Sequence, residues 1–197
     1  MVACYRAAEA LRPKERRVCY DPLARHFLRS SYRLACRLGP LARPLFWLLA
    51  ERLFSDDVAQ GIGRTRFIDD YVEQCINANI GQMVILGAGF DTRAYRLTKT
   101  EALNVFEVDH PATQKSKKQK LSSLLGGLPP HVTYVSIDFD LETLEEKLFE
   151  NGYNKDLKTL FIWEGVTYFL TAEGIDSTLA FVSANSGPGS SIVFDYI

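Results

Sequence analysis

The sequence predicts an α/β fold, in which a parallel sheet flanked by helices follows an N-terminal helical part. Two observations lead to this prediction. In residues 1–80 the apolar positions recur three and four residues apart, whereas residues 81–197 hold short apolar runs that alternate with helical stretches. Strands that alternate with helices form parallel βαβ units with right-handed crossovers. We therefore expect a helical lid over residues 1–80 and an α/β core over residues 81–197.

The N-terminal part is expected to contain several short helices, because prolines interrupt its helical pattern. These prolines are Pro13, Pro22, Pro40 and Pro44. The last helix of this part is predicted over Gly63–Asn77, where the apolar residues fall on one side. The most hydrophobic run, Pro44–Ala50, is too short to cross a membrane, because a span needs ~20 apolar residues. We expect no membrane span.

Five short apolar runs of the second part are predicted to be strands. They are Met83–Leu86, Asn104–Asp109, Val132–Asp138, Thr159–Glu164 and Ser191–Tyr196. The helices between them are predicted over Pro111–Leu125, Leu141–Glu150 and Thr171–Ala184. Because the sequence ends directly after the fifth run and would leave a half-built sheet edge exposed, we expect a chain that is truncated after its fifth strand.

Charge and cysteine content argue against several function classes. The 23 Lys and Arg residues nearly balance the 24 Asp and Glu residues, so there is no electrostatic case for nucleic acid as the partner. The basic run Lys115–Lys120 lies in a predicted helix without interleaved aromatic residues, which favours a solvated face. The four cysteines form no CxxC pair, so no metal site is predicted. With no apolar signal segment and with reduced thiols, we expect a cytoplasmic protein.

A glycine-rich turn, Gly87-Ala88-Gly89, follows the first predicted strand. Such a turn brings backbone N–H groups close to a ligand without side chains in the way. A close strand–helix turn without any ligand has a similar sequence, so the pattern is weak by itself. The second strand ends at Asp109, about 20 residues later, where an acidic side chain can accept both hydroxyls of a ribose. Together the two features indicate an adenosine-type ligand.

Thr92 helps to choose between two such ligands. The third glycine of a GxGxxG pattern would fall at residue 92, and a dinucleotide needs it for close approach of its pyrophosphate to the helix. S-adenosylmethionine (SAM) carries no phosphate and does not need that glycine. Thr92 therefore argues mildly against NAD and agrees with SAM.

Asp138 closes the third predicted strand and is followed by Phe139. An acid followed by a bulky apolar residue can bind an adenine amino group and pack against its ring. In the alternative interpretation, Asp138 or Asp140 is the N-cap of a helix that begins at Leu141. The residues alone leave both interpretations open.

Glu164 closes the fourth predicted strand, at the edge where open α/β sheets bind ligands. A buried structural ion pair is the alternative, but the neighbouring Gly165 and Tyr168 add a flexible turn and a hydroxyl, which favours a functional role. Arg64 and Arg66 precede the first strand, and either can bind a carboxylate through two parallel hydrogen bonds. A solvated helix face is their alternative. No pattern identifies a catalytic residue, and no GxSxG sequence is present.

These residues together resemble the leucine carboxyl methyltransferase family, which includes bacterial and polyketide-pathway O-methyltransferases. The matching pieces run in the order of the family from about residue 5 to residue 197. They are Tyr20-Asp-Pro22, Gly63–Asp69 (GRTRFID), Leu86–Arg93 (LGAGFDTR), Phe106–Pro111 (FEVDHP), Ile137-Asp138 and Glu164–Tyr168 (EGVTY). The combination of LGAGFDTRAYRL with FEVDHP is specific.

The resemblance implies the Rossmann-like fold of class I SAM methyltransferases, with SAM as the cofactor. It assigns cofactor contacts to six positions: the SAM carboxylate to Arg64, the methionine portion to Gly87, the ribose hydroxyls to Asp109, the adenine to Asp138 and Phe139, and the SAM amino group to Glu164.

The implied reaction transfers a methyl group to a carboxylate or another oxygen acceptor, on a small molecule or at the C-terminal carboxylate of a protein. A carboxylate acceptor is already ionised at neutral pH and needs no general base, whereas a phenol or alcohol needs one, for which Tyr168 or a histidine is a candidate. Because family members continue past the fifth strand, an inactive, truncated methyltransferase fold that binds SAM or a protein partner is the alternative hypothesis. An NAD-dependent oxidoreductase is the third.

Overall fold

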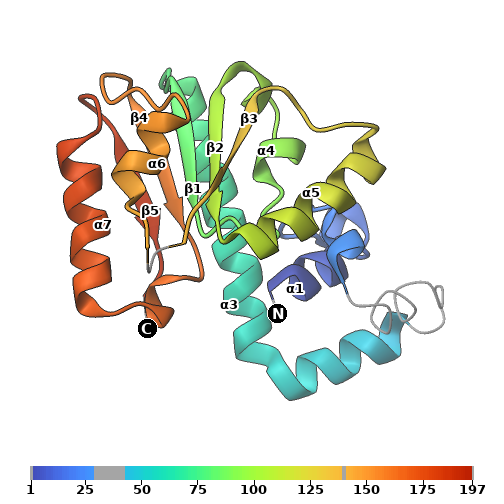
Figure 1. Ribbon diagram of the computed structural model, residues 1–197. Helices are drawn as coiled ribbons and strands as arrows, with labels where there is room; N and C mark the ends of the chain where they lie inside the picture. The colour runs from blue at the N-terminus through green and yellow to red at the C-terminus, as the bar shows by residue number, and fades with distance from the viewer. Residues whose placement is uncertain (1, 29–42, 139–140, 197) are drawn as a thin grey trace. The chain divides into compact units, whose positions relative to one another are not determined.

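The computed structural model describes residues 2–28, 43–138 and 141–196 (Figure 1). These residues divide into two compact units, one from residues 1–71 and 90–96 and one from residues 72–89 and 97–197. The segment 90–96 thus belongs with the N-terminal helices, although it lies between the first two strands in sequence.

The first unit is helical. Its elements are α1 (Val2–Glu9), η1 (Lys14–Arg16), η2 (Ala24–Phe27), most of α3 (Arg43–Asn77), and α4 (Arg93–Arg96). Small residues allow close packing between them: Ala7 and Ala24 are buried together with Leu28. A Cβ added to Gly61 of α3 would lie 3.0 Å from the ring of Tyr5 in α1. The helical character predicted for this part is therefore present in the described residues.

Helix α3 begins at Arg43, far before the predicted start at Gly63, so the predicted start is wrong. The physical reason lies at Pro44, the second residue of the helix. The N–H groups of a first helical turn have no intrahelical partner, so a proline costs nothing there. A proline that suggested an interruption instead lies where a helix tolerates it. The predicted end at Asn77 is confirmed.

The second unit contains a five-stranded parallel sheet of order β3-β2-β1-β4-β5. Its strands are β1 (Gln82–Leu86), β2 (Asn104–Asp109), β3 (Val132–Ser136), β4 (Thr159–Trp163) and β5 (Ser191–Phe194). The last three strands end one or two residues before their predicted ends, because Asp138, Glu164 and Asp195 lie in the segments that follow them. The short helices η3 (Thr100–Ala102) and η4 (Thr167–Phe169) lie in connections.

Helices cover both faces of this sheet (Figure 1). On one face, Leu148 of α6 (Leu144–Glu150) and Phe181 of α7 (Ala172–Ala184) join a core that includes Phe106 of β2. Successive side chains of a strand point to opposite faces. Glu107 therefore points to the other face, where it contacts Lys117 of α5 (Pro111–Leu125). The predicted Rossmann-like α/β architecture, a parallel sheet flanked by helices, is confirmed.

The starts of the helices follow their N-caps. Helix α5 has its predicted bounds, and the His110 side chain accepts a hydrogen bond from the Ala112 N–H. Helix α6 begins at Leu144 and not at Leu141, because the Thr143 side chain is its N-cap and accepts from the Glu146 N–H. The interpretation of Asp138 as the N-cap of this helix is therefore wrong, and Asp140 lies outside the described residues.

Candidate functional site

The turn after β1 has a conformation and a neighbour that both require glycine. Gly87 and Gly89 have positive φ angles of 64° and 41°, a region that glycine adopts without steric cost. A Cβ added to Gly87 would collide with Cγ2 of Val166, which follows β4. The connection after β4 thus closes directly against the turn after β1.

Asp109, the last residue of β2, holds this turn. Its Oδ2 accepts a hydrogen bond from the Gly89 N–H, and its Oδ1 accepts one from the His110 N–H at 2.7 Å. The Ala88 N–H donates to the Val108 carbonyl at 2.9 Å. Asp109 is half-buried at the edge of the sheet.

Asp138 lies just beyond β3 and is half-buried. Its backbone N–H donates to Glu142 Oε2 at 3.0 Å, and its carbonyl accepts from the N–H groups of Leu141 and Glu142 at 3.0 and 2.8 Å. These bonds form a turn that separates the end of β3 from α6. Phe139, predicted to pack against adenine, lies outside the described residues.

Glu164 follows β4, and the connection that carries it is fixed by Asp195, which follows β5. Asp195 accepts three hydrogen bonds: from the Gly165 N–H at 2.7 Å, from Tyr168 Oη at 3.1 Å, and, through its carbonyl, from Thr167 Oγ1 at 2.5 Å. Sequence reasoning missed Asp195. The signal that identifies it is shared with Asp109, since both are acids at the end of an apolar strand.

The strand register brings four of the predicted site residues to one edge of the sheet. Ile85 pairs with Ile162, so Gly87 and Glu164 stand at the same level, two residues farther on. Leu86 pairs with Val108, which places Asp109 level with Gly87. Asp109 in turn pairs with Ser136, two residues before Asp138. This is the carboxyl edge, where open α/β sheets bind ligands.

A cavity of about 420 Å³ opens beside this edge, a size typical of small-molecule sites. Gly87 and Val166 form part of its wall, Trp163 and Phe181 supply aromatic surface, and Glu142 and Thr143 contribute polar groups. The arrangement can enclose a flat apolar group and offer hydrogen-bond partners at its rim.

The remaining predicted residue, Arg64, is half-buried on α3 in the first unit. Arg66, considered beside it, is exposed and pairs with Asp70 one turn later, with Nε 2.8 Å from Oδ2. The interpretation of a solvated helix face is confirmed for Arg66.

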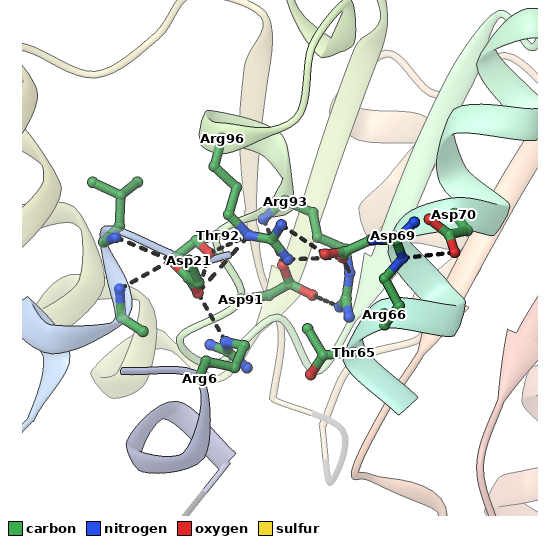
Figure 2. Close-up of polar contacts among 12 residues, drawn as sticks. Arg6, Asp21, Thr65, Arg66, Asp69, Asp70, Asp91, Thr92, Arg93 and Arg96 are labelled. Carbon is green, nitrogen blue, oxygen red and sulfur yellow. Dashed lines mark hydrogen bonds and ion pairs between the residues drawn. The ribbon is translucent and has the colours of Figure 1, made fainter. Parts of the chain in front are cut away.

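The residues that follow the turn belong to a network of buried charges in the first unit (Figure 2). Asp21 accepts hydrogen bonds from Arg6 Nε at 2.8 Å and from Thr92 Oγ1 at 2.7 Å. Asp69 of α3 accepts from Arg93 Nε at 2.8 Å and from Nη1 and Nη2 of Arg96, each at 2.7 Å.

Two further contacts belong to the same network. Arg6 Nη2 donates to the Phe90 carbonyl at 2.6 Å, and Asp91 Oδ2 accepts from Arg93 Nη1 at 2.5 Å. Burial opposes the charge on Arg96, but the hydrogen bonds and charge of Asp69 and the charge of Asp21 outweigh it, so the pKa of Arg96 is raised. The second half of the motif LGAGFDTRAYR thus fastens the N-terminal helices to one another.

Within the described residues, no group of His, Cys, Asp and Glu side chains is arranged to hold a metal ion. The same residues contain no helix that is long and apolar enough to cross a membrane.

A family model described as leucine carboxyl methyltransferase matches residues 1–183. The chain belongs to the leucine carboxyl methyltransferase family. The expected resemblance is confirmed, and the match covers the first unit and most of the second, ending before β5.

Two relatives of this family member are bacterial proteins. The "Putative S-adenosyl-L-methionine-dependent methyltransferase YktD" of Bacillus subtilis is 45% identical over 116 residues, which cover 58% of this chain and 38% of the relative. A "Putative S-adenosyl-L-methionine-dependent methyltransferase" of Mycolicibacterium vanbaalenii is 36% identical over 134 residues, which cover 68% of this chain and 43% of the relative. The chain spans less than half the length of these relatives.

Solved structures similar to this family member include the glycopeptide N-methyltransferase MtfA in complex with S-adenosyl-L-homocysteine. The TM-score is 0.45 at 14% identity, with 64% of this chain and 50% of MtfA covered. A TehB-like SAM-dependent methyltransferase from Corynebacterium glutamicum gives a TM-score of 0.42 at 21% identity, covering 61% and 59%. The assignment of the Rossmann-like fold to this chain depends on its own parallel strand order, β3-β2-β1-β4-β5.

Proposed function

We propose that this family member is a SAM-dependent methyltransferase, which binds SAM at the carboxyl edge of its sheet and methylates a carboxylate or another oxygen acceptor. The observation that carries the proposal is the turn at Gly87, where neither the φ angle nor Val166 leaves room for a side chain. Asp109 stands at the end of the adjacent strand. A glycine turn beside an acid at the end of the next strand is an arrangement by which open α/β folds bind a nucleoside with free ribose hydroxyls.

Asp109 retains the capacity to bind a ribose. The two oxygens of an ionised carboxylate accept about four hydrogen bonds. The N–H groups of Gly89 and His110 use two of them. The remaining capacity matches the two ribose hydroxyls.

We assign the adenine ring to the cavity that Gly87, Val166 and Trp163 line, and we assign its contacts to Asp138 and Phe139. The support is the size of the cavity, about 420 Å³, and its aromatic wall. A flat heteroaromatic ring gains from burial against aromatic side chains, provided that its polar edge finds partners. The turn at Asp138 supplies such partners next to the cavity, since Glu142 belongs to both.

We assign the amino-acid end of SAM to Gly87, Glu164 and Arg64. Glu164 stands level with Gly87 at the sheet edge, so its carboxylate can receive an ammonium group there. Arg64 can bind a carboxylate through two parallel hydrogen bonds. In this proposal residues 1–80 form a lid and residues 81–197 the cofactor-binding core.

SAM supplies a methyl group on a positively charged sulfur, and its transfer is an in-line displacement. The residues of the chain act by holding donor and acceptor in near-attack geometry and by excluding water. A carboxylate acceptor needs no proton removed. For a phenol or alcohol, Tyr168 is the candidate base, and Asp195 orients its hydroxyl. We propose small molecules and protein C-terminal carboxylates as the acceptor classes.

The proposal is tested by isothermal titration of the folded chain with SAM, with NAD as competitor, followed by transfer of labelled methyl to small carboxylic acids and to peptides. We expect SAM to bind in the micromolar range, ~8 kcal/mol, and NAD not to displace it. Displacement by NAD, or absence of SAM binding to the folded chain, contradicts the proposal. Binding without transfer to any acceptor contradicts the catalytic part alone.

A further inference from the structure

One lysine of the basic run Lys115–Lys120 is not on a solvated face. Lys115 is exposed, whereas the side chain of Lys117 is only 1% exposed. The predicted solvated face is therefore wrong for Lys117. Its Nζ lies 2.8 Å from Oε2 of Glu107, which is also 1% exposed.

Stability alone does not explain this buried pair. Removing two charges from water costs several kcal/mol per ion, and replacing a buried pair by apolar residues of similar volume is often neutral or stabilising. A buried ion pair is therefore expected to have a role other than stability. The position of Lys117 supplies one, because its Nζ also lies 3.4 Å from the carbonyl oxygen of Ala88 in the glycine turn.

The Ala88 carbonyl and the Gly89 N–H belong to the same peptide unit. Lys117 holds the carbonyl end, and the Asp109 carboxylate accepts from the N–H end. Glycines with positive φ flank this turn, and glycine allows a peptide unit to rotate more freely than other residues do. Two contacts at opposite ends fix the plane of the Ala88–Gly89 peptide, and with it the orientation of Asp109.

We propose that Lys117 is a positioning residue of the SAM site. Through the Ala88–Gly89 peptide it orients the carboxylate of Asp109 toward the ribose, without touching SAM itself. Glu107 serves to keep the Lys117 ammonium in place, since an unpaired ammonium in the interior is costly. The inference rests on the proposed function, because it assumes that SAM occupies this turn.

One matched comparison isolates Lys117, because Lys117→Met/Glu107→Gln differs from Glu107→Gln only at residue 117. A second variant, Lys117→Met/Glu107→Leu, replaces the whole pair by apolar side chains and is compared with wild type. Lys115→Met is the control for loss of a lysine from the same helix. For each chain we would measure the SAM dissociation constant by calorimetry, the melting temperature, and the exchange rate of the Gly89 amide proton by NMR.

We expect Lys117→Met/Glu107→Gln to bind SAM about tenfold more weakly than Glu107→Gln does, and Lys117→Met/Glu107→Leu to bind it about tenfold more weakly than wild type. One lost hydrogen bond to a charged group has an effect of this size. The Gly89 amide should exchange faster in the SAM-free chain, while Lys115→Met matches wild type. Unchanged SAM affinity and Gly89 exchange in a folded variant without Lys117 overturn the inference. If Lys117→Met/Glu107→Leu does not fold, the Glu107→Gln comparison decides. A wild-type chain that does not bind SAM contradicts the proposed function and this inference together.

Discussion

Leu86–Gly89 and Phe90–Arg96 are consecutive in sequence and differ in almost every physical respect. The first stretch has no charged side chain, its glycines have positive φ, and its backbone groups contact β2 and α5. The second stretch carries Asp91, Arg93 and Arg96, which form ion pairs within the first unit (Figure 2). The first stretch has only small side chains after Leu86, and the second stretch is dense in paired charges.

The difference shows that a single sequence motif can contain two devices. A binding turn needs backbone groups that a ligand can approach, so bulky side chains are excluded from it. A scaffold of buried charges is stable only when each charge has a partner. Substitutions in the first device should therefore affect ligand binding, and substitutions in the second should affect folding.

The largest effect is expected for Gly87→Val, which adds a branched side chain where the backbone φ is +64° and where a Cβ already collides with Val166. Calorimetry should detect no SAM binding. Gly63→Ala is the control, because Gly63 lies in a helix with no atom within 4 Å of its added Cβ. It should bind SAM like wild type, and equal loss of binding in both variants would break the comparison.

A large loss of stability is expected for Asp69→Ala, which leaves the guanidinium groups of Arg93 and Arg96 without their shared carboxylate. Breaking a buried pair costs about 3–5 kcal/mol. Asp70→Ala removes the exposed partner of Arg66 and should cost less than about 1 kcal/mol. Urea unfolding measures both, and equal values would show that the buried network does not stabilise the first unit.

A moderate effect is expected for Asp195→Ala, which frees the Gly165 N–H and the Tyr168 hydroxyl. The connection that carries Glu164 then loses two hydrogen bonds to the Asp195 side chain, and SAM should bind several-fold more weakly. Tyr168→Phe removes one hydrogen bond to the Asp195 carboxylate at an exposed site, and it should weaken SAM binding less than Asp195→Ala does. A weaker effect for Asp195→Ala than for Tyr168→Phe would reject this role.

The smallest effect concerns Cys19 in the first unit. Burial, then the charges of Asp69 and Glu9, raise the pKa of its thiol to about 11. Because the thiolate is the reactive form, Cys19 should be alkylated by iodoacetamide at pH 8 after the half-buried Cys4 and Cys75. Peptide mass spectrometry gives the order in which the cysteines are alkylated. Alkylation of Cys19 before Cys4 and Cys75 would contradict the raised pKa of its thiol.

Much of the second unit could be predicted from the sequence, because the residues that signal the bounds of its strands and helices lie within or next to them. Helix α5 has its predicted bounds, with a proline at its start and a glycine after its end. The start of α3 could not be predicted, since Pro44 signals a break in mid-helix and none in a first turn. The positions of Gly87 and Asp109 could be predicted from the sequence. Each lies at the end of a predicted strand, and their separation along the chain is that of a nucleoside-binding motif.

The remaining site features depend on partners that are distant in sequence. Thr92 and Asp21 are 71 positions apart, and no local pattern links them. Lys117 looked solvated because its neighbours are lysines, and its burial follows from the direction in which Glu107 points from β2. Pairing of this kind becomes visible only when the strands and helices are in place.

The central claim is tested most directly by titrating SAM into Asp109→Ala and measuring its free energy of unfolding alongside. Loss of two hydrogen bonds from ribose hydroxyls to a charged group should weaken SAM binding by about a hundredfold. Unfolding should change far less than in Asp69→Ala, because Asp109 is half-buried and belongs to the open turn. Equal SAM affinity in Asp109→Ala and wild type would contradict the account.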